Sequence, residues 1–180
     1  MKDDDIFFRE LIEEAKCFLE KAKKEVDQQG KNAYLHASLL IAFGALEAHI
    51  NSIADDFADR KELASLEKSI LLEKKITFER GEFKLTEQLK MYRLEDRIEF
   101  IIRRFSRKSV KKNEPWWMKL KQGIKLRNKL VHPRGKESIN ESMVENSIQA
   151  ILDTLNFIYK AVYKAPYPLA KRGMVSSLNF

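Results

Sequence analysis

The chain has 180 residues, 44% hydrophobic and 34% charged, which is enough for a domain with a hydrophobic core and excludes a disordered chain. The single cysteine, Cys17, excludes an intramolecular disulfide framework and is expected to pack as a small apolar residue. The net charge is +7, the first residues lack a signal-peptide pattern, and the longest near-apolar stretch, 37–46, is too short to span a membrane. We therefore expect a cytoplasmic protein with no membrane partner.

Apolar spacing predicts two long helices at the start of the chain, over about 4–29 and 32–58. Gly30 is expected to end the first helix. The second is apolar nearly all round from 39 to 48 apart from Glu47, and such a helix belongs at the centre of a bundle. A short helix over about 61–73 should follow. The inward stripe expected for the first helix consists of Phe7, Leu11, Ala15, Phe18, Ala22 and Val26.

The spacing of apolar residues changes in the middle of the chain. Residues 76–85 alternate between apolar and polar around Arg80–Gly81, which predicts a small β-hairpin or an extended excursion. A helix over about 87–106 follows. The basic loop 107–113 then leads to Asn113, which is expected to cap the next helix.

That next helix is predicted from Pro115, which suits a first turn, to about Val131. Pro133 sets its end because the residue before a proline is driven out of the α region. A last long helix is predicted over 141–164. The segment 165–180 is expected to be an arm, with four apolar residues available for docking: Met174, Val175, Leu178 and Phe180.

Together these elements predict an all-α fold, an antiparallel bundle of four to five main helices with a possible small β-hairpin. Each apolar stripe needs a partner helix to bury it. No domain boundary is evident in the sequence, so a single domain over 1–180 is expected.

The positive charge is concentrated in one block. Residues 103–134 contain 12 Lys and Arg and one acid, Glu114, which gives +11 and leaves 7 − 11 = −4 for the rest of the chain. A localised positive field suits a polyanion such as nucleic acid, although a solvated helix face and loop is an equal alternative from charge alone. If RNA binds, the cations expected to guide it are Arg103, Arg104, Arg107, Lys108, Lys111, Lys112, Lys125, Lys129 and Arg134.

One position breaks the apolar pattern of the helix over 115–131. Its stripe runs through Trp117, Leu120 and Ile124 and then reaches Arg127. A guanidinium on a buried stripe is costly unless it is paired or lies at a wet interface, and departures from packing rules often mark functional sites. Asn128 and His132, four residues apart, share one side of this helix end.

These three side chains have a defined chemistry. Arginine offers a fixed, charged fork that suits phosphate, and histidine can accept or donate a proton near neutral pH. Together they could support metal-independent phosphoryl transfer on RNA. Arg127 would stabilise the phosphorane, His132 would act as general acid or base, and Asn128 would orient the imidazole or a substrate oxygen. The structural alternative is that Arg127 pairs with a core carboxylate, Glu47 being the obvious candidate, and that His132 merely ends the helix.

The run 126–133, Leu-Arg-Asn-Lys-Leu-Val-His-Pro, resembles the signature of the HEPN superfamily. Those domains are helical bundles whose motif is an arginine, a polar residue, three to five further residues and a histidine. The segment around Glu47 also resembles HEPN helices that carry a glutamate near the motif. The resemblance covers about two-thirds of the chain. Some HEPN toxins have a tyrosine two residues after the histidine, and Arg134 at that position argues against those subfamilies.

The resemblance implies a metal-independent endoribonuclease whose composite active site forms at a homodimer interface and leaves a cyclic phosphate. It implies Arg127, His132 and Asn128 as catalytic residues, with Glu47 behind Arg127, and a toxin or antiviral-defence role in which an antitoxin protein is a possible partner. No cofactor or metal is expected, since His36 and His49 lack acids or cysteine at ligand spacing. A non-catalytic module that binds RNA, a nucleotide or a protein stays open as the alternative.

Overall fold

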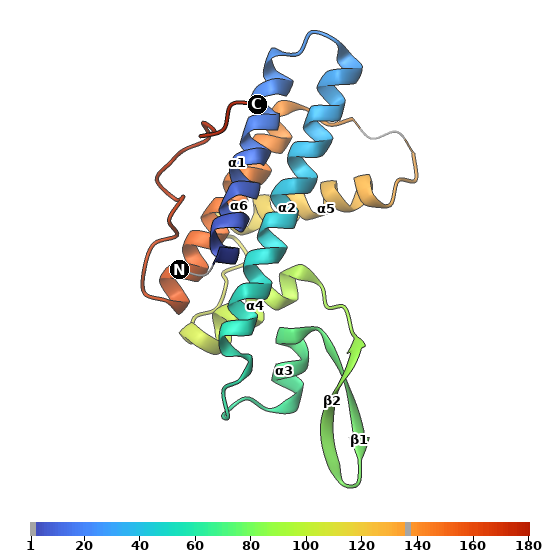
Figure 1. Ribbon diagram of the computed structural model, residues 1–180, viewed down its shortest axis with the longest axis vertical. Helices are drawn as coiled ribbons and strands as arrows, with labels where there is room; N and C mark the ends of the chain where they lie inside the picture. Colours follow the sequence, from blue (N-terminus) through green and yellow to red (C-terminus); the bar gives the residue numbers. More distant parts are fainter. Residues whose placement is uncertain (1–2, 136–137) are drawn as a thin grey trace. The chain divides into compact units, whose positions relative to one another are not determined.

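The computed structural model describes residues 3–135 and 138–180 (Figure 1). The described part is mostly helical with one small antiparallel hairpin, as the sequence predicts. Its elements in chain order are α1 (Asp3–Lys24), α2 (Gln28–Ala58), α3 (Ser65–Leu72), β1 (Lys74–Glu79), β2 (Glu82–Leu89), α4 (Leu94–Ser106), α5 (Pro115–Val131) and α6 (Glu141–Val162).

The chain forms two compact units, and α2 contributes to both. Unit 1 consists of the residues up to Leu46 together with Val110–Phe180, and unit 2 is Glu47–Ser109. The single domain expected over 1–180 stays a prediction.

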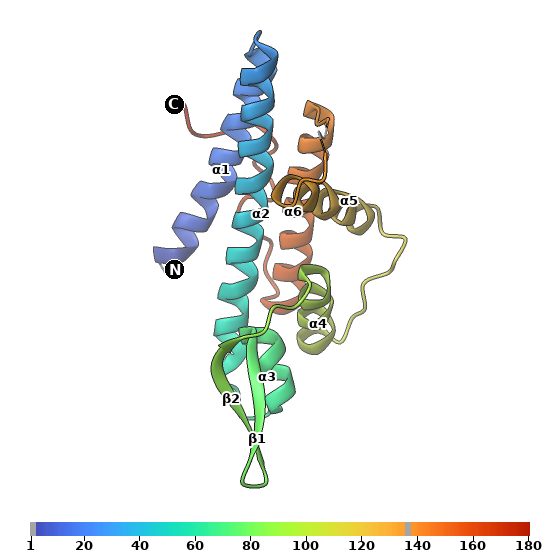
Figure 2. The same ribbon diagram turned by 90° about the vertical axis from the view of Figure 1, so that its right-hand side faces the viewer.

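Unit 1 is a helical bundle. α1 and α2 run antiparallel, and α6 runs antiparallel to α1 (Figures 1 and 2). Ion pairs fix this order: Lys23 in the last turn of α1 pairs with Glu145 of α6 at 2.7 Å, and Lys31 of α2 pairs with Glu141 at 2.9 Å. The start of α6 therefore lies beside the turn that joins α1 to α2.

The core of unit 1 comes from four helices, each of which buries one apolar face. Full burial of one such side chain contributes about 1.5–3 kcal/mol. The buried apolar residues of these helices include Ile12, Leu19, Leu35, Leu39, Phe43, Leu46, Trp117, Leu120, Val144, Ile148, Ile151, Leu155 and Ile158.

α5 crosses α6 instead of lying along it (Figure 2). The two helices approach closely at Gly123, where an added Cβ would lie 2.9 Å from the hydroxyl oxygen of Ser147 and 3.0 Å from the ring of Phe43. A residue without a Cβ is needed for this approach. Gly123 therefore fixes where α5 crosses the bundle.

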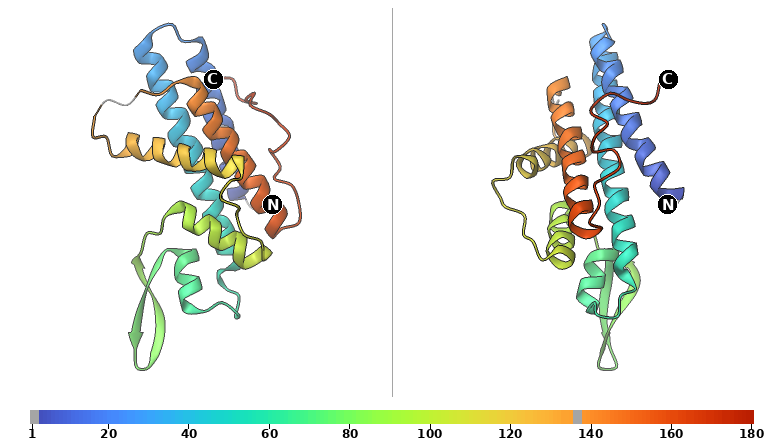
Figure 3. Two further views of the ribbon diagram at one scale, coloured as in Figure 1. Left: turned by 180° about the vertical axis from the view of Figure 1, so that it is seen from behind. Right: turned by 90° about the vertical axis from the view of Figure 1, so that its left-hand side faces the viewer.

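The arm 165–180 leaves the end of α6 and returns along the bundle toward the end of α1 (Figure 3). Tyr167 and Leu169 anchor its first part and are buried. Phe180 contacts the ring of Phe18 edge-on, with 5.3 Å between ring centroids. Of the residues expected to dock, Val175 is 75% exposed, so that part of the expectation is wrong.

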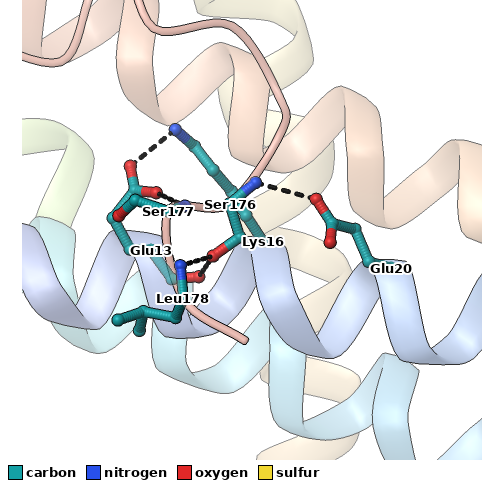
Figure 4. Close-up of polar contacts among 6 residues, drawn as sticks. All are labelled: Glu13, Lys16, Glu20, Ser176, Ser177 and Leu178. Atoms are coloured by element: carbon teal, nitrogen blue, oxygen red, sulfur yellow. Dashed lines mark hydrogen bonds and ion pairs between the residues drawn. The ribbon is translucent and has the colours of Figure 1, made fainter. Parts of the chain in front are cut away.

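Polar contacts with α1 hold the far part of the arm (Figure 4). Ser176 donates its backbone N–H to Glu20 at 2.7 Å and its hydroxyl to the backbone oxygen of Glu13 at 2.7 Å. The N–H of Ser177 donates to the carboxylate of Glu13 at 2.6 Å. The same carboxylate pairs with Lys16, whose side chain is fully buried. Burial alone would raise the pKa of Glu13, but the Ser177 N–H and the Lys16 ammonium outweigh it and lower that pKa.

Unit 2 contains α3, the hairpin and α4. Strands β1 and β2 meet at Arg80–Gly81, where both residues have positive φ (53° and 84°), as a two-residue hairpin turn requires. α3 packs against the hairpin, and the hydroxyl of Ser69 donates to the backbone oxygen of Lys74 at 2.5 Å. The hairpin expected over 76–85 is confirmed and extends at both ends.

Several predicted boundaries are wrong for local reasons. Gly30 does not end a helix: its N–H donates to Asp27 at 2.7 Å, so Asp27 caps α2. Val26 lies in the link before α2 and is 97% exposed. β2 occupies the start of the helix expected from residue 87, so α4 begins at Leu94. The N-cap of α5 is Glu114, not Asn113, because the residue before Pro115 must be extended.

By length and composition α2 could cross a membrane, contrary to the expectation based on residues 37–46. In the structure 56% of its most apolar window is buried. The core helix of a soluble protein can have the same length and composition, because such a helix is apolar nearly all round.

Candidate functional site

The motif Arg127, Asn128 and His132 lies at the end of α5 in unit 1. α5 ends at Val131, as the sequence predicts, and His132 adopts φ −126° and ψ 66° before Pro133. Its backbone N–H still donates to the backbone oxygen of Asn128 at 2.9 Å. The backbone of His132 is thereby held at the point where the chain leaves the helix.

The apolar stripe of α5 leaves the core before it reaches the motif. Trp117, Leu120 and Ile124 are buried, whereas Arg127 is half-buried and Val131 is 44% exposed. The expectation that Arg127 lies on a buried stripe is therefore wrong. The last turn of α5 carries the arginine into partial contact with solvent, where a guanidinium keeps its charge at little cost.

Two motif side chains contact each other directly. Nη1 of Arg127 donates to Oδ1 of Asn128 at 3.1 Å. This bond orients the amide so that its NH₂ group points away from the guanidinium and can donate elsewhere. Asn128 and His132 are both exposed, so in a single chain the motif is an open surface site.

Glu47 belongs to unit 2, whereas Arg127 belongs to unit 1. Within unit 2, Glu47 acts on Arg97 of α4, whose guanidinium is buried. Burial lowers the pKa of Arg97, and the charges of Glu73, Glu47 and Asp55 oppose that shift. The role of Glu47 behind Arg127 stays a prediction, and Arg97 is an interaction of Glu47 that the sequence did not suggest.

The guanidinium of Arg97 joins α4 to α2 and to the end of α3, although its Nε is buried without a hydrogen-bond partner among the described residues. It donates from Nη1 to Glu73 and to Asn51, each at 2.9 Å, and from Nη2 to the backbone oxygen of Leu71 at 2.7 Å. These contacts tie α4 to the segment that enters the hairpin. Its position beside Ile98, on the inward side of α4, was the available sequence signal.

The predicted RNA-guiding cations divide between the units, with Arg103, Arg104, Arg107 and Lys108 in unit 2 and the other five in unit 1. Arg104 is occupied, since its Nε donates to Glu67 at 2.7 Å. The others are exposed: Arg103, Arg107, Lys108, Lys111, Lys112, Lys125, Lys129 and Arg134.

One face of the Trp116 ring is occupied. The ring stacks on Phe157 with centroids 5.1 Å apart and meets Trp117 edge-on. Trp116 therefore fastens the start of α5 to α6, and Trp117 is buried beside it.

A groove of about 560 Å³ lies between α5 and the first turns of α6, beside the Gly123 crossing. No sequence signal pointed to it, because its walls meet through the crossing of two helices. Its lining residues are Lys119, Gln122, Gly123, Leu126, Asn140, Ser142, Met143, Asn146 and Ser147.

Comparison with known protein families, curated proteins and solved structures gave no match. In residues 3–135 and 138–180, no three His, Cys, Asp or Glu side chains gather in the manner of a metal site.

Proposed function

We propose that this protein is a metal-independent endoribonuclease of the HEPN type, active as a homodimer. The observation that carries the proposal is the end of α5, where Arg127, Asn128 and His132 lie within one and a half helical turns and all reach the surface. A charged fork, an amide and an imidazole at one surface point suit a phosphodiester substrate.

The reaction follows from these groups. The ribose 2′-oxygen attacks the adjacent phosphorus while the bond from phosphorus to the 5′-oxygen breaks, so the products are a 2′,3′-cyclic phosphate and a 5′-hydroxyl. No water and no oxidant is consumed. His132 removes the 2′-hydroxyl proton, and the proton returned to the 5′-oxygen comes from the imidazolium of the second copy. Arg127 stabilises the extra negative charge on the phosphorane oxygens.

A second copy of the chain would complete the exposed site. One motif in one chain is an exposed helix end with one imidazole, and general acid and base catalysis of this step uses two. Two motifs facing each other supply both imidazoles and remove water from the phosphate, which strengthens the charge interactions of Arg127. A toxin or defence role in the cytoplasm, with an antitoxin as a further partner, belongs to the same proposal.

The exposed cations support the RNA part of the proposal. Eight of the nine predicted guiding residues are exposed, and exposed lysines and arginines attract a phosphate backbone without reading its sequence. Each phosphate contact makes binding weaker as salt rises.

The test is degradation of labelled total RNA in excess EDTA by purified wild type and by Arg127→Ala, Asn128→Ala and His132→Ala. We expect each of the arginine and histidine variants to lose at least about 100-fold in rate, the low end for loss of a general acid or base. His36→Ala, a half-buried histidine of α2, is the matched control and should cut like wild type.

Cleavage by His132→Ala at the wild-type rate would overturn the site assignment. Salt-sensitive RNA binding without any turnover by wild type would replace the enzyme with a non-catalytic binding module. That module would have to retain its affinity in His132→Ala.

A further inference from the structure

The groove between α5 and α6 is built by two facing stripes. On α5 the residues Lys119, Gln122, Gly123 and Leu126 follow the spacing of one helix face, and on α6 Met143 and Ser147 oppose them. Because Gly123 lets the helices touch at the crossing, they diverge from there and leave the groove open. The hollow is thus a consequence of the fold of unit 1.

Most of the lining surface is apolar, and polar atoms interrupt it at a few points. These are the amides and hydroxyls of Gln122, Asn146, Ser142 and others, and the single charged residue is Lys119. None of the lining residues is a carboxylate. The apolar side chains are Leu126 and Met143, too few to receive the apolar stripe of a partner helix, which needs three or four anchors.

In two asparagines of the groove, one atom of the side-chain amide makes a hydrogen bond and the other atom is available. Oδ1 of Asn140 accepts the N–H of Met143 at 3.0 Å, which leaves its NH₂ group as a donor. Nδ2 of Asn146 donates to the backbone oxygen of Ser142 at 2.8 Å, which leaves its Oδ1 as an acceptor. The backbone partners settle which amide atom is which.

A donor and an acceptor beside a thioether and an aliphatic side chain match a nucleobase. The edge of a base carries donors and acceptors, which amide side chains recognise. Its flat face packs on apolar side chains such as Leu126 and Met143, and Lys119 supplies a cation for the attached phosphate.

The groove also lies close to the motif along α5. Leu126 of the groove directly precedes Arg127, and His132 follows six positions further on, about 9 Å along the axis at 1.5 Å per residue and on another side of α5. An RNA strand that leaves the groove along the end of α5 would therefore pass the imidazole.

We propose that the α5–α6 groove binds a nucleobase of single-stranded RNA next to the phosphate cut at His132. This inference rests on the proposed RNA-directed function, and it assigns a base subsite to it. Bases that fit the donor and acceptor of Asn140 and Asn146 are preferred, so cleavage is selective in sequence.

The test uses NMR of the full chain labelled with ¹³C at the methionine methyl groups. Met143 lines the groove and is 45% exposed, and Met91, 76% exposed in unit 2, reports non-specific effects. The 5′-monophosphates of adenosine, guanosine, cytidine and uridine are titrated separately to about 10 mM, above the millimolar range of weak specific binding. Ribose 5-phosphate is the ligand control without a base.

We expect a saturable shift of the Met143 methyl signal with at least one nucleotide, no shift with ribose 5-phosphate, and no shift of Met91. Asn146→Ala should weaken the binding by about 5- to 10-fold, the effect of one hydrogen bond. Asn179→Ala, which removes an exposed amide near the end of the arm, should leave it unchanged.

A silent Met143 signal with all four nucleotides would overturn the base subsite, and so would an equal response to ribose 5-phosphate. The two failures are separable. RNA cleavage with a silent Met143 removes the subsite and leaves the ribonuclease, whereas a nucleotide-dependent Met143 shift without RNA cleavage removes catalysis and leaves the subsite.

Discussion

Arg97 and Arg127 lie beside apolar residues of α4 and α5, but they differ in how deeply they are buried and in their hydrogen-bond partners. Arg97 is 4% exposed and donates to Glu73, Asn51 and the backbone of Leu71. Arg127 is half-buried at a helix end and donates to its neighbour Asn128. A buried arginine with partners from several segments holds a fold together. An arginine brought to the surface beside a histidine lies where a ligand can reach it.

Replacement of the buried arginine should give the largest loss of stability. Arg97→Ala leaves the Glu73 carboxylate without its ion-pair partner in a mostly buried setting, which costs about 3–5 kcal/mol of unfolding free energy. Urea unfolding measures it. Arg103→Ala, which removes an exposed arginine of the same helix, is the matched control and should change stability by less than about 0.5 kcal/mol. Equal losses in the two variants would erase the distinction between them.

The close crossing of α5 and α6 gives a second contrast, between a tight and an open glycine. Gly123→Ala places a Cβ 2.9 Å from Ser147 and should destabilise by about 1 kcal/mol, since overpacking of about 1–3 kcal/mol exceeds the gain in helix propensity. Gly44 of α2 has nothing within 4 Å of a new Cβ, so Gly44→Ala should stabilise by about 0.5–1 kcal/mol. Thermal unfolding of both variants decides whether the crossing is as close as described.

The carboxylate of Glu13, which the arm covers, is buried and hydrogen-bonded, in contrast to the exposed motif. The pKa of Glu13 is lowered in the folded protein, so its stabilising contribution is complete above the unfolded pKa of about 4.5 and is lost as pH falls through the lower folded value. The unfolding free energy of wild type should fall more steeply than that of Glu13→Gln below about pH 4.5. Glu145→Gln, which removes an exposed ion pair, should follow wild type. Parallel curves for wild type and Glu13→Gln would contradict the arm contacts.

Glu47 gives the smallest expected effect and separates its two possible partners. If its charge serves Arg97, Glu47→Gln lowers stability by less than about 1 kcal/mol and leaves the cleavage rate per folded molecule unchanged. If it also serves Arg127, as the resemblance implies, the cleavage rate falls as well. We expect the loss of stability in either case, because the charge of Glu47 acts on Arg97, and the cleavage rate tests the predicted role behind Arg127.

The sequence predicted the elements whose signals are local. Pro115 and Pro133 placed α5 to the residue, and Arg80–Gly81 placed the hairpin turn. Features that depend on two segments meeting were missed. Gly123 looks like any helical glycine until α6 lies against it, and the buried pair of Glu13 and Lys16 makes sense once the arm covers α1.

In the candidate site, too, the sequence predicted the local features and missed those that depend on two segments meeting. Proline punctuation fixed the position of Arg127, Asn128 and His132 at a helix end, and this is what the structure contains. The depth of Arg127 was wrong because an apolar stripe does not tell where its helix leaves the core. Residues of the groove, such as Asn140 and Asn146, carry no pattern of their own and become neighbours through the crossing.

We propose that the end of α5 cuts RNA by attack of the 2′-hydroxyl without a metal. A labelled RNA oligonucleotide incubated with wild type in EDTA, followed by identification of the ends produced, tests this chemistry. We expect 2′,3′-cyclic phosphate and 5′-hydroxyl ends, no cleavage of the same oligonucleotide with 2′-deoxyribose, and no cleavage by His132→Ala. Cleavage that needs Mg²⁺, or that cuts the 2′-deoxy substrate, would contradict it.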